Sequence, residues 1–212
     1  MNRRLWTMAL ASGLGLGSLL APVAAFADSE TPDALVKRIS SDVLDTIKSD
    51  PSLRGGDMSK INALVNDKVM PFVNFRRMTS AAVGPAWRKA TEPQRERLLK
   101  EFNSLLVRTY AGALSQVSDQ TITVKPLRAA AGDTDVLVRT EVHGKGDPVQ
   151  LDFRLEKDAN GWKIYNFNVL GVWLVETYRN QFAEEINKNG IDGLIQTLAS
   201  RSSMPADVPV KK

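Results

Sequence analysis

The sequence predicts an α+β fold: a four-stranded antiparallel, curved sheet packed by helices, an arrangement that can enclose an apolar cavity. Two observations lead to this prediction. Apolar residues recur at helical spacing in the first half of the chain and again near its end. Between these parts, over about 120–169, apolar and polar residues alternate, which is typical of an antiparallel meander with one covered face. Helices on either side of a strand meander indicate the α+β class.

The first 27 residues have the pattern of a secretory signal peptide. Arg3 and Arg4 precede an uncharged, mostly apolar run over 5–21, and Ala-Phe-Ala at 25–27 is a small-x-small cleavage pattern. A membrane anchor is the alternative reading, but the apolar run is short and rich in glycine. We therefore expect cleavage after residue 27 and export, and a periplasmic location agrees with a chain that has no cysteine.

Helix signals divide the first half of the mature chain. Thr31-Pro32 fits an N-cap followed by the first helical residue, and Asp57 can cap the next helix. Thr91 and Gln94 form a capping-box pattern that opens the longest helix. Near the end of the chain, Asn189-Gly190 separates two shorter helices. Helices are expected over about 32–50, 57–70, 75–83, 92–117, 173–188 and 191–201.

Four alternating runs predict the strands, at about 121–125, 136–143, 149–156 and 162–169. The turn between the last two is Asp-Ala-Asn-Gly at 158–161. Alternation places Asp152, Arg154 and Glu156 on the wet face of the third strand. We expect one continuous domain over 28–201 and a flexible tail over 202–212, which has two prolines and no periodic pattern.

Charge is unevenly distributed along the chain. The totals of 28 basic and 24 acidic residues give +4, and removing the two arginines of the signal leaves 26 against 24. Residues 68–108 alone carry nine basic and three acidic groups. These form either a solvated face or a positive surface for an anionic headgroup or an acidic partner, with Arg76, Arg77 and Arg88 as candidates. Export and the small net charge argue against nucleic acid.

The composition excludes several chemistries. With no cysteine and one histidine, the chain has no disulfide, no thiolate or multi-histidine metal site and no cysteine nucleophile. His143 is interpreted as a surface residue, and no metalloprotease or nucleophile-elbow motif occurs in the mature chain. We predict no catalytic residue, no metal and no cofactor. An enzyme acting on a small substrate, with Tyr165 or Asp152 as acid or base, remains an alternative.

The sequence feature that does indicate a function is its set of large apolar residues. Large apolar and aromatic side chains occur on the predicted helices and on the covered face of the sheet, where they either fill a core or line a cavity. Sequence alone does not separate these two roles. The candidate cavity residues are Val69, Phe72, Phe75, Met78, Phe102, Leu106, Tyr110, Leu151, Phe153, Leu155, Tyr165, Phe167, Val169, Val172, Leu174 and Tyr178.

Several short segments together resemble a known family. They are VMPFVNFRRMT at 69–79, VG at 83–84 with WR at 87–88, F at 102 with LLVRTY at 105–110, WKIY at 162–165, NV at 168–169 with GV at 171–172, YRNQF at 178–182 and GIDGLI at 190–195. In this order, over about 65–200, they resemble the MlaC family, also called toluene-tolerance proteins. The family pattern has Asp where this chain has Asn166, so no charge-dependent role is carried to that position.

The resemblance implies a periplasmic phospholipid carrier, with phospholipid as cargo. Such a carrier shuttles lipid between an outer-membrane lipoprotein complex and an inner-membrane ABC-type transporter complex, and so maintains outer-membrane lipid asymmetry. It implies a monomer with transient membrane-surface contact and an apolar lipid cavity between sheet and helices. Besides the small-substrate enzyme, an envelope adaptor protein without a ligand is the alternative function.

Overall fold

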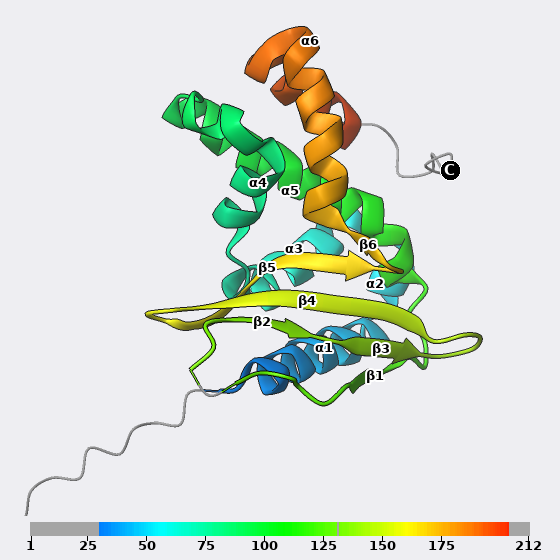
Figure 1. The fold of residues 1–212 in the computed structure, drawn as a ribbon. Helices are drawn as coiled ribbons and strands as arrows, with labels where there is room; N and C mark the ends of the chain where they lie inside the picture. The colour runs from blue at the N-terminus through cyan, green and yellow to red at the C-terminus, as the bar shows by residue number, and fades with distance from the viewer. Residues whose placement is uncertain (1–29, 131, 204–212) are drawn as a thin grey trace, which may run out of the picture.

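A computed structural model describes residues 30–130 and 132–203 (Figure 1). The predicted signal peptide at 1–27 and most of the predicted tail, 204–212, lie outside the described residues. The α+β class is confirmed, and the helices fall close to their predicted positions. They are α1 (Pro32–Ser49), α2 (Pro51–Arg54), α3 (Met58–Lys68), η1 (Met70–Phe72), α4 (Phe75–Val83), η2 (Gly84–Arg88), α5 (Glu92–Ser115) and α6 (Leu174–Ser203).

Two of the three predicted N-caps make side-chain hydrogen bonds, whereas Thr31 precedes α1 at the N-cap position without one. The Asp57 carboxylate accepts hydrogen bonds from the backbone N–H groups of Ser59 and Lys60 at the start of α3. The capping box of Thr91 and Gln94 is present at the start of α5. The two helices predicted at the C-terminal end are the halves of α6, which is kinked at Gly190, where φ is 70°.

The prediction of four strands is wrong, because the sheet has six. They are β1 (Thr121–Val124), β2 (Asp135–Val138), β3 (Thr140–His143), β4 (Val149–Asp158), β5 (Gly161–Val169) and β6 (Val172–Trp173). The order is β1-β3-β4-β5-β6 with β2 also paired to β4, and all named pairs are antiparallel. The extra strands come from one interruption and one short addition.

The interruption lies at Arg139. Strands β2 and β3 pair with β4 in one continuing register, but the Thr140 N–H donates to the buried Asp152 carboxylate at 3.2 Å. The Arg139 carbonyl accepts instead from the Lys125 N–H at 2.9 Å. Asp152 is therefore only 3% exposed, and its predicted place on a wet face is wrong. The addition is β6, a two-residue strand after a tight turn.

A β-bulge changes the alternation of β5. Arg154 lies opposite Asn166 and Leu155 opposite Ile164, so Tyr165 is an extra residue between them. Ile164 therefore shares the apolar face with Phe167, and Tyr165 falls out of the alternation. This shift of one residue could not be read from the sequence, because a bulge is set by the pairing with the neighbouring strand and has no distinct composition of its own.

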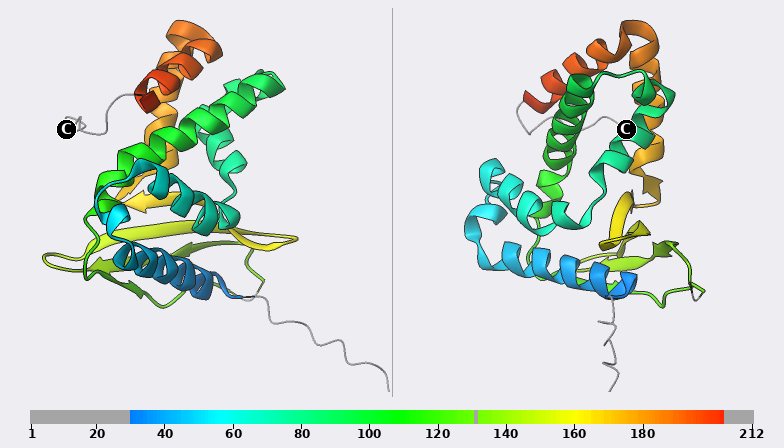
Figure 2. Two further views of the ribbon diagram at one scale, coloured as in Figure 1. Left: turned by 180° about the vertical axis from the view of Figure 1, so that it is seen from behind. Right: turned by 90° about the vertical axis from the view of Figure 1, so that its left-hand side faces the viewer.

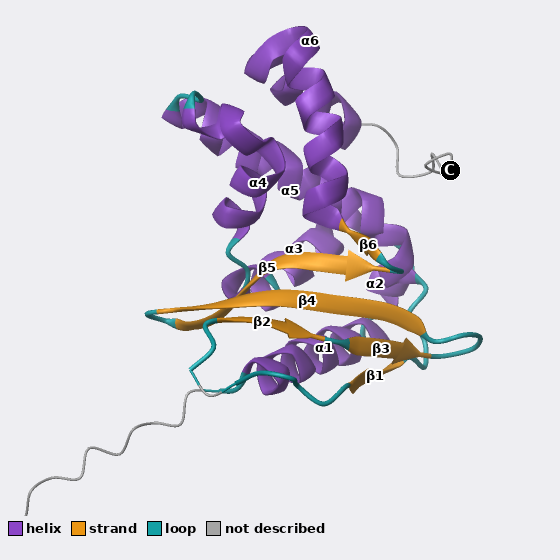
Figure 3. Cartoon of the chain, in the orientation of Figure 1, coloured by secondary structure: helices purple, strands orange, loops and turns teal. Residues whose placement is uncertain are grey.

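Buried apolar side chains form three clusters. The helical core joins α4, α5 and α6, and the sheet core joins α1 to β2, β4 and β5. A third cluster joins α1, α2, α3 and α5. The helices α1–α3 lie to one side of the sheet, whereas α4, α5 and α6 rise from it as a helical lobe (Figures 2 and 3). No helix of the described residues is both long enough and apolar enough to cross a bilayer.

Candidate functional site

Half-buried apolar side chains connect the helical core to the sheet core. Val73 and Phe167 each pack against both clusters without being fully buried. Besides some residues of α4, η2 and α6, a set of half-buried residues from η1, α5 and β5 also packs on the helical core. We call this set the apolar seam, and its members are Met70, Val73, Leu99, Leu106, Tyr110, Phe167 and Val169.

Helix α5 supplies one side of the seam because its faces have different neighbours. Leu99, Leu106 and Tyr110 follow one stripe at helical spacing. Phe102 belongs to the helical core on one side of this stripe, and Val107 belongs to the third cluster on the other. At 1.5 Å per residue the stripe is about 16 Å long, which suits an elongated ligand.

The sheet supplies the other side. Phe167 lies opposite Phe153 in the register, with ring centroids 5.6 Å apart in an edge-to-face arrangement. One row further along, Val169 lies opposite Leu151, and both are half-buried. The apolar face of the sheet is thus less covered where β4 begins and β5 ends.

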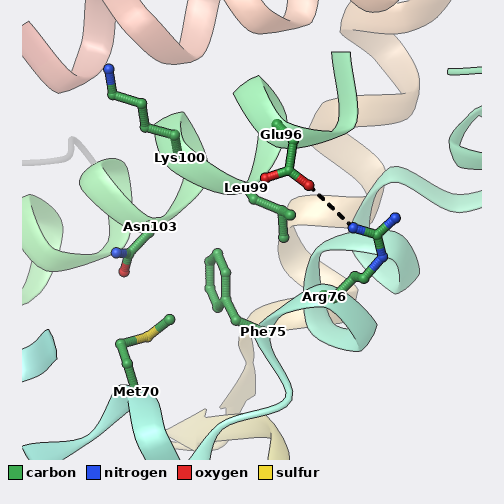
Figure 4. A pocket seen from close by; sticks show the side chains of 7 residues that line it. All are labelled: Met70, Phe75, Arg76, Glu96, Leu99, Lys100 and Asn103. Atoms are coloured by element: carbon green, nitrogen blue, oxygen red, sulfur yellow. Dashed lines mark hydrogen bonds and ion pairs between the residues drawn. The ribbon is translucent and has the colours of Figure 1, made fainter. Parts of the chain in front are cut away.

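A pocket of about 390 Å³ opens between α4 and α5 at the other end of the seam (Figure 4). Met70, Phe75 and Leu99 point towards one another inside it, and the Arg76–Glu96 pair spans its rim. Apolar walls with a charged rim suit an amphipathic ligand. The pocket is lined by Met70, Phe75, Arg76, Glu96, Leu99, Lys100 and Asn103.

A second pocket of about 250 Å³ lies between α1 and α3. Asp50, Lys60, Asp67 and Lys68 line it together with a few apolar side chains. The Lys60 ammonium is 3.3 Å from the Asp50 carboxylate. Its Leu53 and Leu64 belong to the third cluster, so this pocket lies away from the seam.

The candidate arginines are in three different environments. Arg76 pairs with Glu92 at 2.9 Å and with Glu96 at 3.3 Å. Arg77 pairs with Glu156, and its guanidinium lies 3.5 Å from the centre of the Tyr165 ring. The predicted basic surface is thus partly neutralised by neighbouring carboxylates.

Arg88 lies at the far end of the helical lobe, in η2. Its backbone carbonyl accepts a hydrogen bond from Arg95 at 3.4 Å. Arg95 also pairs with Glu92 on α5. Of the three candidate arginines, only Arg76 lines the pocket between α4 and α5.

The sixteen candidate cavity residues differ in how deeply they are buried. Seven are buried: Phe75, Met78, Phe102, Leu174 and Tyr178 in the helical core, and Phe153 and Leu155 in the sheet core. Seven are half-buried: Val69, Phe72, Leu106, Tyr110, Leu151, Phe167 and Val169. Val172 is exposed, and Tyr165 lies in a polar network. Apart from Phe75, which lines the pocket between α4 and α5, the half-buried residues are the ones that a ligand could reach with the smallest rearrangement.

The two residues suggested for acid–base chemistry form hydrogen bonds within the sheet. The Tyr165 hydroxyl donates to Asp135 at 2.9 Å, and burial together with this hydrogen bond raises the pKa of Tyr165. Asp152 accepts from the Thr140 backbone and from the Gln150 amide. Neither lines the pocket between α4 and α5, and both are engaged by their neighbours, so the geometry does not support a catalytic role.

Tyr110 is the polar member of the seam. Burial raises the pKa of its hydroxyl to about 12, so the side chain is neutral at physiological pH. Among the described residues, no three His, Cys, Asp or Glu side chains gather in a way that could hold a metal ion. The seven side chains of the seam are thus all uncharged at physiological pH, as contact with hydrocarbon requires.

Three members of the seam were missed by the sequence reasoning. Met70, Val73 and Leu99 were not among the candidate residues. Leu99 lies seven residues before Leu106 on the same stripe of α5, so dividing that helix into separate apolar faces could have found it. Met70 and Val73 belong to an irregular segment around η1, where no periodicity gives a signal.

Comparisons with known proteins bear on this site. A family model described as MlaC protein matches residues 37–200. The intermembrane phospholipid transport system binding protein MlaC of Haemophilus influenzae is 25% identical over 82% of this chain and 84% of its own length. The toluene tolerance protein ttg2D of Pseudomonas putida is 26% identical over 77% of each chain.

A solved structure is similar over most of the described fold. It is the phospholipid-binding protein from Ralstonia solanacearum in complex with a phospholipid, 51% identical, with a TM-score of 0.79. The match covers 81% of this chain and 96% of the other. The fold that surrounds the seam is therefore also the fold of a protein solved with a phospholipid bound.

Proposed function

This chain belongs to the MlaC family, and we propose that it is a phospholipid-binding transport protein that holds acyl chains along the apolar seam. One observation carries the assignment to the seam. The helical core and the sheet core are separate clusters, and half-buried Val73 and Phe167 link them. Separating the lobe from the sheet along this line would expose apolar walls and leave both clusters intact.

The size of the cargo explains why a pocket alone is insufficient. A diacyl lipid has about 30 methylene-type groups, each worth roughly 0.8 kcal/mol on burial, so exposure to water would cost about 25 kcal/mol. A pocket of about 390 Å³ lies at the small end of ligand sites and cannot cover that hydrocarbon alone. We therefore expect α4 and α5 to shift away from the sheet when lipid enters.

Of the three candidate arginines, Arg76 is the one placed to contact a headgroup, at the rim of the pocket between α4 and α5. Arg76 lines the pocket there and pairs with exposed carboxylates, so it can turn to a phosphate at little cost. Arg77 is held by Glu156 and Tyr165, which favours a structural role. Arg88, at the far end of the lobe, is the candidate of the three for contact with a partner protein.

The wider setting is also part of the proposal. Residues 1–27 would direct export to the periplasm, residues 28–201 would form the lipid-binding domain, and residues 202–212 would be a tail. The protein would act as a monomer between an inner-membrane ABC-type transporter complex and an outer-membrane lipoprotein complex. The name of the Haemophilus relative, an intermembrane transport binding protein, supports this setting.

Mass spectrometry of organic extracts tests the proposed function. Protein purified without detergent from a Gram-negative host should release phospholipid, at about one molecule per chain. Extracts free of phospholipid in every preparation would contradict the proposal. A urea-unfolded and washed sample of the same protein is the control, since it should release none.

A further inference from the structure

The apolar face of the sheet is left uncovered at one end. Of the described residues, the large hydrophobics that are exposed are Val149, Leu170 and Val172, at 38%, 67% and 50% of their surface. Leu170 lies in the turn between β5 and β6, Val172 starts β6 and Val149 starts β4; these strand ends are at the right-hand end of the sheet in Figure 1. We call these three residues the exposed apolar end. Single exposed hydrophobic side chains scattered over a surface are ordinary. When all the large ones lie at one end of a sheet, they indicate an interaction site.

Backbone pairing places the three residues at the same end of the sheet. The Leu170 N–H donates to the carbonyl of Gln150, next to Val149, at 3.0 Å. Val172 pairs with Val169 across the β5–β6 turn. The patch is therefore part of the sheet rather than of a long loop.

The exposed apolar end continues the seam. On β4 the apolar face runs from Leu155 and Phe153, both buried, to half-buried Leu151 and exposed Val149. The next strands repeat this order, because Val169 is half-buried and its partner Val172 is exposed. The residues of the apolar face thus become progressively more exposed from the proposed cargo site to the end of the sheet.

The chemistry of this end favours hydrocarbon. Residues 168–175 carry no charge, and the tip of the turn is Leu170-Gly171. Leu170 has a φ of 54°, and it is the one non-glycine residue with positive φ in the described chain. Asn-Gly is the preferred pair for such a turn, so a leucine here adds apolar surface where a polar residue would fit the backbone better.

We propose that the exposed apolar end is the portal through which acyl chains enter and leave the seam, in direct contact with the surface of a phospholipid bilayer. This inference rests on the proposed function. It adds a second opening, distinct from the charged pocket between α4 and α5. A chain sliding along β4 and β5 would keep one side against apolar side chains from the bilayer to the seam, which lowers the barrier to transfer.

The test compares two ends of the molecule. Delipidated protein is mixed with vesicles of phosphatidylethanolamine and phosphatidylglycerol that contain a pyrene-labelled phospholipid, and uptake is followed by fluorescence. In the test variant, Leu170→Asn and Val172→Thr remove the apolar surface while suiting the turn and the strand. Uptake should slow about tenfold, since the lost apolar contact amounts to a few methylene groups. Lipid content after purification and the melting temperature should stay at the wild-type values.

Three results would overturn the portal. Uptake at the wild-type rate in the test variant would show that the patch is not on the route. If Leu99→Asn, at the pocket between α4 and α5, slowed uptake while the test variant did not, the route would lie at that pocket. Loss of purified lipid from the test variant would make the patch part of the storage site. Wild-type protein that carries no lipid at all would contradict the proposed function instead.

A second measurement reports contact directly. The chain has no cysteine, so Leu170→Cys provides a single site for an environment-sensitive dye. Its emission should shift to the blue when vesicles are added. Ala159→Cys, in the hairpin turn at the opposite end of the sheet, is the matched control and should not shift. Equal shifts at both positions, or none at Leu170→Cys, would overturn the portal.

Discussion

Phe102 and Phe167 carry the same side chain but have different structural roles. Phe102 is fully buried, and its ring lies 4.9–5.7 Å from the rings of Tyr178, Phe182 and Phe75. Phe167 also has an aromatic partner, Phe153, but it is half-buried and shared by two clusters. The first lies within a core and the second between two cores.

The difference predicts separate consequences for folding and for cargo. Complete burial gives a side chain its full share of the hydrophobic free energy, and such residues keep the fold together. A half-buried side chain contributes less to folding, so the surfaces it joins can part at lower cost. Substitutions within the clusters should therefore affect stability first, and substitutions along the seam should affect lipid first.

The largest effect is expected at Phe102. Phe102→Ala should lower the free energy of unfolding by about 3–5 kcal/mol, since it leaves a cavity among three aromatic rings. Phe167→Ala should cost clearly less, because its side chain is only half-buried in the native state. Urea unfolding followed by circular dichroism measures both. Equal losses would remove the distinction between core and seam.

The next effect is on lipid occupancy. Val169→Asp places a carboxylate in the seam, where burying the charge would be costly, so lipid per chain should fall about tenfold. Leu151→Asp should act in the same way, because Leu151 lies opposite Val169. Val169→Thr keeps the shape and is the matched control. A folded Val169→Asp protein with the wild-type lipid content would place this residue outside the cargo site.

A smaller effect is expected on the polar side of the sheet. Arg77 pairs with Glu156 and stacks on Tyr165, but it is 37% exposed, so solvent weakens the pair. A double-mutant cycle of Arg77→Ala and Glu156→Gln should give a coupling of about 1 kcal/mol in unfolding. The lipid content of both single variants should match the wild type. Lost lipid in these variants would extend the cargo site to this side.

The smallest effect is a pH dependence far from the seam. Hydrogen bonds from the Ser52 hydroxyl and N–H, helped by nearby Lys60, lower the pKa of Asp50 from 3.8 to about 2. A lowered folded-state pKa stabilises the protein fully above the unfolded value and loses that contribution as pH falls through the folded value. Asp50→Asn should thus melt below the wild type at pH 7, and the gap should close between about pH 4 and pH 2.

Ser52→Ala is the control for this pH effect, because it removes the hydroxyl that contributes most to the shift. Its melting temperature should also approach the wild-type value as the pH falls towards 2. A gap that stays constant over this range would contradict the role assigned to the Asp50 carboxylate. Lipid content should not change in either variant, since Asp50 lies outside the seam.

Local patterns were sufficient for much of the fold. The capping box at Thr91, the turn at 158–161 and the break at Gly190 each fixed a boundary close to its place in the structure. These signals depend on residues near in sequence, which is why they could be read directly. The family resemblance then supplied the function, which the apolar residues alone could not.

Features that depend on neighbours in space were not predictable. The bulge that displaces Tyr165 arises from pairing with β4, and the burial of Asp152 arises from the backbone of Thr140. Periodicity shows which way a side chain faces but not how well that face is covered. Phe153 and Val149 lie on the same face of the same strand, yet one is 5% exposed and the other 38%. That gradient of cover defines both the seam and the exposed apolar end.

A crystal structure of the protein purified with its native lipid tests the central claim most directly. The account predicts electron density for acyl chains between the α5 stripe at Leu106 and Tyr110 and the sheet at Phe167 and Val169. It also predicts a wider separation of α5 from β5 than in the structure described above. Acyl density confined to the pocket between α1 and α3, or a lipid-loaded protein with the seam closed, would contradict the account.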